Sequence, residues 1–113
     1  MANLSFDGVT ITGMAGAVPS NVINNREYTQ YFDKDVVGEI IDKTGVEQRR
    51  ISNDQTTASD LCFAAAKQLL SDLKIDTSEI DVLLFVSQTP DYRMPATSIV
   101  LQGRLGLPKT TAA

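Results

Sequence analysis

IDVLLFVSQTPDYRMP, residues 80–95, is the segment that decides the predicted fold. It contains five consecutive apolar residues, 82–86, which are rich in β-branched and aromatic side chains. This run is too short for a buried helix, and it lacks the alternation of a half-exposed strand. We therefore predict a strand covered on both faces, as in the parallel sheets of α/β proteins.

A loop with two prolines, residues 87–95, follows this predicted strand. Ligands bind at the carboxyl ends of the strands in open α/β sheets, and a long, punctuated loop at that position is often functional. Tyr92 and Met94 would suit the wall of an apolar pocket or a subunit contact. A plain surface loop is the alternative that the residues leave open.

The segments before the loop predict the elements that a buried strand needs. Residues 9–17 alternate and contain glycines that allow another backbone to approach, which predicts a strand. Short helices are predicted at residues 26–32 and 36–43, and Gly45 is placed to end the second in the left-handed conformation. The region 46–51 is predicted to be extended.

The clearest helical pattern spans residues 58–73, where apolar residues recur at a spacing of four and Thr56 or Thr57 can cap the first turn. A last helix is predicted at residues 96–105. A helix between two strands implies a right-handed parallel crossover, so the predicted fold class is α/β. Residues 110–113 begin another extended segment, and we expect the protein to continue beyond it.

The composition of the chain narrows the possible functions. The 113 residues suit one domain, and the net charge of −4 disfavours a nucleic-acid or anionic-membrane surface. No apolar run approaches the ~20 residues of a membrane span, and the amino terminus does not resemble a signal peptide. A single cysteine fits a reducing compartment, so we expect a cytoplasmic protein. The sequence contains no histidine, so a self-sufficient hydrolase triad or zinc site is not expected.

Cys62 is the one thiol in the chain. It lies in the middle of a predicted helix on the apolar side, with no basic residue directly beside it to stabilise a thiolate. We predict a buried structural cysteine rather than a nucleophile.

A cluster of basic residues surrounds the Thr-Gly-Val sequence at 44–46 and consists of Lys43, Arg49 and Arg50. Such a cluster could bind an anion such as a phosphate. Ion pairs with Asp42 and Glu47 would account for it equally well, and the residues alone do not decide between the two.

Read in order, the chain resembles the amino-terminal third of β-ketoacyl-acyl carrier protein synthase III, a condensing enzyme of the thiolase superfamily. The collinear runs that carry the resemblance are ITGMAGAVPSNVINN, IIDKTGVEQRRI, ASDLCFAAAKQLL and IDVLLFVSQTPDYRMPATSIVLQGRLGL. The resemblance implies a partial thiolase-like fold, with residues 1–113 as the amino-terminal portion of an αβαβα domain, truncated before the nucleophilic cysteine.

The same resemblance implies an acyltransferase of fatty-acid biosynthesis. A family enzyme moves an acyl group from acyl-coenzyme A to a cysteine and condenses it with malonyl-acyl carrier protein, with loss of carbon dioxide. The implied partners are acyl carrier protein, an acyl thioester and a second copy in a homodimer, with no cofactor. The family's cysteine, histidine and asparagine would lie beyond residue 113, so no catalytic residue is assigned here and the segment alone is expected to be inactive. Cys62 does not match the nucleophile's motif.

Two substrate-binding residues are carried over from the family pattern. Lys43 occupies the basic position before Thr-Gly, near the coenzyme A phosphates, where arginine is usual. Four residues earlier, Glu39 replaces an aromatic residue that often stacks on the adenine, so a carrier protein or a specialised acyl group is an alternative donor. Met94 matches the apolar tip of a loop that walls the acyl pocket across the dimer, which suggests a primer longer than acetyl.

Two other classes of function remain open on the sequence. One is another condensing enzyme of the superfamily, such as a hydroxymethylglutaryl-coenzyme A synthase or a secondary-metabolite synthase, which the Glu39 departure favours. The other is a non-catalytic α/β fragment that oligomerises or docks a partner through an exposed sheet edge.

Overall fold

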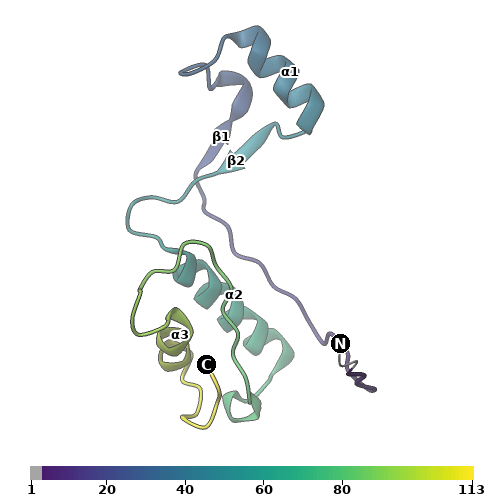
Figure 1. The fold of residues 1–113 in the computed structure, drawn as a ribbon, viewed down its shortest axis with the longest axis vertical. Helices are drawn as coiled ribbons and strands as arrows, with labels where there is room; N and C mark the ends of the chain where they lie inside the picture. Colours follow the sequence, from purple (N-terminus) through teal and green to yellow (C-terminus); the bar gives the residue numbers. More distant parts are fainter. Residues whose placement is uncertain (1–3) are drawn as a thin grey trace.

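The computed structural model describes residues 4–113, which fold as two parts joined by single stretches of chain (Figure 1). We call residues 22–50 the hairpin part and residues 57–113 the helix-pair part. The elements are, in order, β1 (Val22–Asn24), the 3₁₀ turn η1 (Asn25–Glu27), α1 (Lys34–Thr44), β2 (Gln48–Arg50), α2 (Ala58–Leu73), the 3₁₀ turn η2 (Thr77–Glu79) and α3 (Thr97–Leu105).

The hairpin part is a two-stranded antiparallel sheet with a helix across it. Strands β1 and β2 pair with Val22 opposite Arg50. Helix α1 confirms the helix predicted at 36–43, and it buries Val37 and Ile41. Gly45 ends α1 with a φ of 70°, and its N–H donates to the carbonyl of Ile41 at 2.7 Å. The predicted role of this glycine is therefore confirmed.

The prediction of a helix at 26–32 was wrong, because the 3₁₀ turn η1 ends at Glu27 and residues 28–32 are not helical. The Asn24 side chain accepts a hydrogen bond from the backbone N–H of Arg26 at 3.1 Å and so caps the short turn. Asn25 makes two hydrogen bonds across the hairpin. Its backbone N–H donates to the carbonyl of Glu47 at 2.8 Å, and its side-chain Nδ2 donates to the carbonyl of Val46 at 2.9 Å. These hydrogen bonds hold Asn25 against the residues that lead into β2, which limits the helix to one turn.

The helix-pair part contains the other two helices that the sequence predicts, α2 and α3. Thr57 begins α2 with a capping box: its hydroxyl accepts from the N–H of Asp60, and its own N–H donates to the Asp60 carboxylate at 3.0 Å. Helix α3 packs against α2 and ends at Gly106 in the left-handed conformation. The buried apolar residues of this part are Leu101 and Leu107.

The covered strand predicted at 82–86 does not form. Within residues 4–113, this segment makes one parallel bridge, Val82 to Ala112, with hydrogen bonds of 2.8 Å on either side. Its side chains alternate: Leu83 and Phe85 are partly covered, whereas Leu84 and Val86 are 83% and 93% exposed. The run is extended as predicted, but only one face is covered because the described part of the chain supplies no full neighbouring strand.

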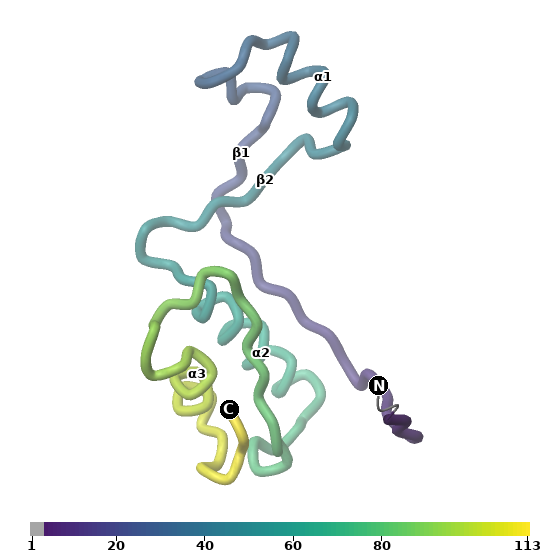
Figure 2. The backbone as a smooth tube through the Cα atoms, viewed as in Figure 1, coloured from purple at the N-terminus to yellow at the C-terminus, as the bar shows by residue number. Residues whose placement is uncertain are grey.

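The strand predicted at 9–17 is also absent, although the segment is extended and runs past α2 toward the amino terminus (Figure 2). Met14 is 85% exposed. Gly13 does permit a close approach, but to side chains rather than to a backbone. A Cβ on Gly13 would lie 2.7 Å from Leu73 Cδ1 and 3.0 Å from Leu69 Cδ1, too close for any larger residue without a shift.

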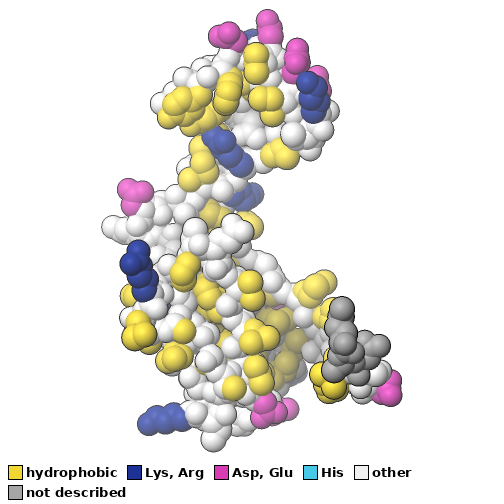
Figure 3. Space-filling model, in the orientation of Figure 1, with side chains coloured by type: hydrophobic (Ala, Val, Ile, Leu, Met, Phe, Trp, Pro, Cys, Tyr) yellow, Lys and Arg dark blue, Asp and Glu magenta, His cyan; other side chains and the backbone are white. Residues whose placement is uncertain are grey.

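Cys62 is exposed on α2, so the prediction that it is buried was wrong. Cys62 shares the apolar face of the helix with Ala65, Ala66 and Leu69, which are only partly covered, so the described residues cover this face incompletely. Figure 3 shows the same pattern more widely, with hydrophobic side chains scattered over the visible face of both parts. The radius of gyration, 19.0 Å, exceeds the roughly 13 Å of a compact chain of this length. Much apolar surface is thus left uncovered.

Candidate functional site

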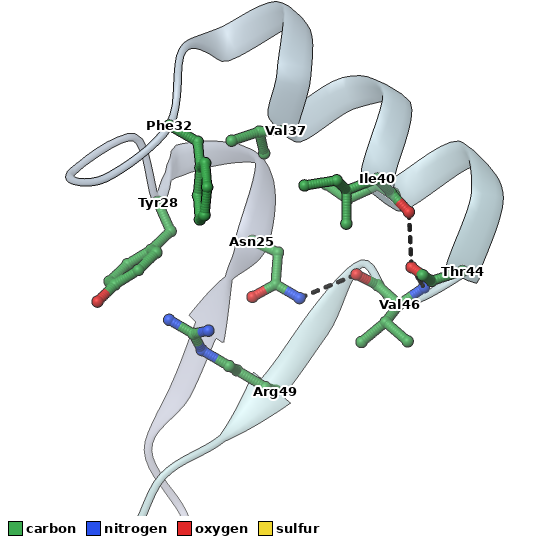
Figure 4. Close-up of a pocket in the computed structure, with 9 residues that line it drawn as sticks. Asn25, Tyr28, Phe32, Val37, Ile40, Thr44, Val46 and Arg49 are labelled. Atoms are coloured by element: carbon green, nitrogen blue, oxygen red, sulfur yellow. Dashed lines mark hydrogen bonds between the residues drawn. The ribbon is translucent and has the colours of Figure 1, made fainter.

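The hairpin part contains an open cavity of about 340 Å³ between α1, η1 and β2 (Figure 4). This volume lies within the range of small-molecule pockets, which are mostly apolar with a few polar groups. The wall is largely aliphatic and aromatic, and it consists of Asn25, Tyr28, Phe32, Val37, Ile40, Ile41, Thr44, Val46 and Arg49.

Arg49 supplies the positive charge of this cavity. Its guanidinium carbon lies 4.2 Å from the centroid of the Tyr28 ring, a cation–π contact that fixes the side chain against the aromatic wall. Arg49 Nε and the Oδ1 of Asn25 are shielded from solvent and have no hydrogen-bond partner within residues 4–113. The cavity can therefore hold an apolar group beside the guanidinium of Arg49, whose Nε is already shielded from solvent.

The structure separates the predicted basic cluster. Arg50 Nη1 donates to the carbonyl of Pro19 at 2.9 Å, and Lys43 Nζ lies 3.6 Å from Glu39 Oε2, while Arg49 faces the cavity. The three cations thus have three different surroundings and do not form one anion site.

The alternative ion pairs expected for the cluster are not formed either. Asp42 and Glu47 lie near Arg26, whose Nη2 is 3.9 Å and 3.3 Å from their carboxylate oxygens. Arg26 had no role in the sequence-based prediction. Arg26 lies in η1, close to Glu47 at the start of β2, and this neighbourhood becomes visible only once the hairpin pairing is known.

Lys43, one of the two predicted substrate-binding residues, is exposed in the last turn of α1. It pairs with Glu39 one turn earlier, and both side chains are more than 70% exposed. An exposed pair of this kind contributes less than about 1 kcal/mol to stability. Its consequence is electrostatic, since any anion that approaches Lys43 also meets the carboxylate of Glu39.

Met94, the other predicted binding residue, is 89% exposed in the loop before α3. That loop and the first turn of α3 border a second, open cavity of about 370 Å³. Its lining consists of Phe85, Ser87, Pro90, Tyr92, Arg93, Ala96, Thr97 and Ser98. Met94 is not part of this lining, and it belongs to a different part of the molecule from Lys43 (Figure 1). The structure does not bring the two predicted residues together.

The sequence-based prediction missed Asp91, which joins the loop 87–95 to α2. Thr57 Oγ1 donates to Asp91 Oδ2 at 2.6 Å, and Ser59 donates to the carboxylate through both its N–H, at 3.3 Å, and its hydroxyl. Burial opposes ionisation of Asp91, but these hydrogen bonds outweigh it and hold the pKa of the carboxyl below its ordinary value. The sequence offered one signal for this contact: an aspartate in the loop, Asp91, and two hydroxyl residues, Thr57 and Ser59, at the start of a predicted helix.

Arg104 extends the Asp91 contacts to α3. Its Nη1 donates to Ser59 Oγ at 3.1 Å and its Nη2 to Asp60 Oδ1 at 2.8 Å, while its guanidinium lies 4.6 Å from the centroid of the Phe63 ring. The hydrogen bond from the Thr57 backbone and that from Arg104 lower the pKa of Asp60. Loop, α2 and α3 are thereby tied by one charged network around Ser59, which is 1% exposed.

No helix within residues 4–113 is both long and apolar enough to cross a bilayer. The same residues contain no group of three or more histidine, cysteine, aspartate or glutamate side chains placed to hold a metal ion.

Comparison with known proteins gives a consistent set of relatives. No protein-family model matches the chain. β-Ketoacyl-[acyl-carrier-protein] synthase III of Syntrophomonas wolfei is 35% identical over 98 residues, which are 87% of this chain and 29% of that protein. The crystal structure of a 3-oxoacyl-(acyl-carrier protein) synthase from Burkholderia xenovorans superposes with a TM-score of 0.82 at 43% identity, over 88% of this chain and 30% of that one.

A solved tetronic acid condensing enzyme is also similar, with a TM-score of 0.72 and 25% identity over 87% of this chain and 32% of that one. The chain therefore spans about 30% of the length of the proteins it matches. These superpositions confirm the predicted fold class, a partial thiolase-like α/β fold.

Proposed function

We propose a function on the premise that this chain is homologous to one segment of the β-ketoacyl-acyl carrier protein synthase III family. As part of a complete subunit of that family, it would serve the decarboxylative condensation of an acyl thioester with malonyl-acyl carrier protein. The observation that carries the proposal is the similarity of both sequence and fold over nearly nine tenths of the chain. We propose no cofactor, and acyl carrier protein and an acyl thioester as partners.

In this proposal the chain supplies binding surface and no catalytic group. It contains no histidine, and Cys62, which is exposed on α2, does not match the motif of the family's nucleophile. Lys43, beside the cavity-lining Thr44, is proposed to face the polar end of the acyl donor. The chain alone is expected to show no condensation activity.

A chimeric enzyme tests the proposal. The matching segment of the Burkholderia xenovorans synthase would be replaced by this chain, and malonyl-dependent condensation would be measured against the unmodified enzyme and against the isolated chain. We expect the chimera to condense an acyl thioester and the isolated chain to be inactive. A correctly folded dimeric chimera with no activity toward any acyl thioester would contradict the proposal.

Met94 is proposed to border the acyl group and to favour a primer longer than acetyl. Its side chain is free in this structure, as a residue that completes a pocket on another subunit would be. Met94→Phe in the chimera should shift the ratio of condensation rates toward short acyl thioesters. The same ratio before and after the substitution would remove the assignment. The homodimer that this arrangement needs, and a cytoplasmic location, are part of the proposal.

A second candidate is a condensing enzyme with a specialised acyl donor in place of acyl-coenzyme A. The ion pair between Glu39 and Lys43 favours it, because a carboxylate 3.6 Å from the lysine ammonium weakens the attraction for phosphate groups. The fold similarity to a tetronic acid condensing enzyme is in keeping with it. Competition between acyl-coenzyme A and acyl-carrier protein donors in the chimera distinguishes the two: preference for acyl-coenzyme A would exclude the second candidate.

A further inference from the structure

The loop 87–95 presents its residues to two different sides. Pro90, Tyr92 and Arg93 line the cavity of about 370 Å³ beside α3. Asp91, between them, turns instead toward the amino end of α2, where it accepts hydrogen bonds from Thr57 and Ser59. The residues that form the wall of the cavity are therefore the immediate neighbours of the residue that holds the loop.

Asp91 is the point at which this loop is fastened. Within residues 4–113, its contacts are the hydrogen bonds that join residues 87–95 to a helix, since those of Ser87 and Thr89 stay within the loop. The Ser59 side chain that donates to Asp91 is itself held in place, because it is buried and also accepts a hydrogen bond from Arg104 of α3. Hydrogen bonds to a charged acceptor are stronger than neutral ones.

We propose that Asp91 is a positioning residue that fastens the loop 87–95 to α2 and so fixes Tyr92 and Arg93 as one wall of the cavity beside α3. The lining of this cavity combines the apolar side chains of Phe85 and Tyr92 with the Arg93 cation. Through this wall and the neighbouring Met94, Asp91 sets which acyl group the loop admits. This last step rests on the proposed condensing function, whereas the fastening itself does not.

The fastening is tested on the chain itself by trypsin cleavage after Arg93, an exposed site three residues from α3. Asp91→Asn keeps the shape of the side chain and removes its charge, so we expect cleavage after Arg93 to become about tenfold faster. Cleavage after Lys67, within α2, is the internal reference and should not change. Asp54→Asn is the matched control, because Asp54 is exposed and has no side-chain hydrogen bond or ion pair among the described residues.

Two results would overturn the fastening. One is equal cleavage after Arg93 in Asp91→Asn and Asp54→Asn. The other is a parallel rise after Lys67, which would mean that the substitution unfolds α2 as a whole. Ser59→Ala provides a milder second variant that leaves Asp91 intact, and it should give a smaller acceleration after Arg93. Both substitutions break the link between the loop and α2, and Ser59→Ala also removes the acceptor of the Arg104 hydrogen bond. The double variant should therefore cleave only slightly faster than Asp91→Asn alone, whereas independent destabilisation would make the two effects multiply.

The effect on substrate choice is measured in the chimera as the ratio of kcat/KM for long and short acyl thioesters. We expect Asp91→Asn to change this ratio severalfold and Asp91→Glu to restore part of it, with Asp54→Asn unchanged. An unchanged ratio together with faster cleavage after Arg93 would overturn the claim about acyl selection. A chimera without any activity would count against the proposed function, while the proteolysis would still decide whether Asp91 fastens the loop.

Discussion

The hairpin part and the helix-pair part are held together by different kinds of interaction. In the hairpin part, backbone hydrogen bonds pair β1 with β2, and α1 covers the sheet with Val37 and Ile41. In the helix-pair part, side chains join the elements: Arg104 and Asp91 meet at Ser59, and the extended segment 82–86 has a single backbone bridge. Within the described residues, the hairpin part therefore pairs the backbones of both of its strands, whereas the backbone of segment 82–86 in the helix-pair part is largely unpaired.

The exposed apolar residues lead to the same distinction. One face of segment 82–86 is partly covered, whereas Leu84 and Val86 on the other face are exposed to solvent. Such alternation is what a strand shows when helices cover one side of its sheet and the other side is bare. We therefore expect the two parts to respond separately to substitution, and the following predictions test that separation, from the largest expected effect to the smallest.

The largest effect is expected in the core of the helix-pair part. Leu101→Ala removes a side chain that is 3% exposed, and the lost burial and the cavity left behind should reduce the free energy of unfolding by about 2–5 kcal/mol. Thermal unfolding followed by circular dichroism should show loss of α2 and α3 signal at a lower temperature. Ile99→Ala, on the exposed side of α3, is the control and should change little. Equal effects would mean that α3 is not packed as described.

The hairpin part should be sensitive at Gly45. Its φ of 70° costs a residue with a Cβ about 1–2 kcal/mol, so Gly45→Ala should destabilise the hairpin part by that amount. Gly38→Ala is the matched control: Gly38 lies inside α1 with open space around it, and alanine there should stabilise the helix by up to about 1 kcal/mol. Amide hydrogen exchange would locate both changes. Faster exchange in α2 after Gly45→Ala would contradict the separation of the two parts.

Acid should weaken the helix-pair part through Asp91. Since its folded pKa is below the unfolded value, this carboxyl contributes stability that is complete above about pH 4 and is lost as the pH falls through the folded pKa. Asp91→Asn should therefore lower stability at pH 7 and flatten its dependence on pH between about 5 and 2. Urea unfolding at several pH values measures this, with Asp54→Asn as the control. A wild-type slope in Asp91→Asn would show that another group carries the acid sensitivity.

The smallest effect on stability is expected at the surface of α1. Glu39→Gln breaks an exposed ion pair one turn long and should change the free energy of unfolding by less than about 0.5 kcal/mol. It also frees Lys43, so the chimera should bind coenzyme A more tightly after the substitution, by a few-fold at low salt. Glu27→Gln, away from Lys43, is the control. If salt does not reduce the gain in binding, the electrostatic explanation fails.

The helices were predictable from the sequence because their signals are local. The spacing of apolar residues and the Thr57 cap gave α2, and Gly45 gave the end of α1. The pairing of β1 with β2 was not predicted, because a three-residue strand has too few residues to show a periodicity. Segment 82–86 was predicted to be covered on both faces because all five of its residues are apolar. The described residues cover only one of those faces, and the apolar content of a segment does not show which neighbours are present to cover it.

The candidate sites were harder to predict for a related reason. Lys43 and Met94 came from the family resemblance, and they lie in different parts of the molecule. The Asp91 network joins residues more than 30 positions apart, through hydroxyl and carboxylate groups that also suit any solvated turn. Only the packing of α3 on α2, which brings Arg104 to Ser59, makes that arrangement specific.

The contact of Gly13 with Leu69 and Leu73 has a consequence for the order in which the chain folds during synthesis. At about 5–20 residues per second, the segment around Gly13 leaves the ribosome several seconds before its partners on α2 are made. During that interval Gly13 lacks the two leucine side chains that lie against it in the structure. The hairpin part closes within about half that length of chain, so it can fold first while the segment ahead of it waits for α2.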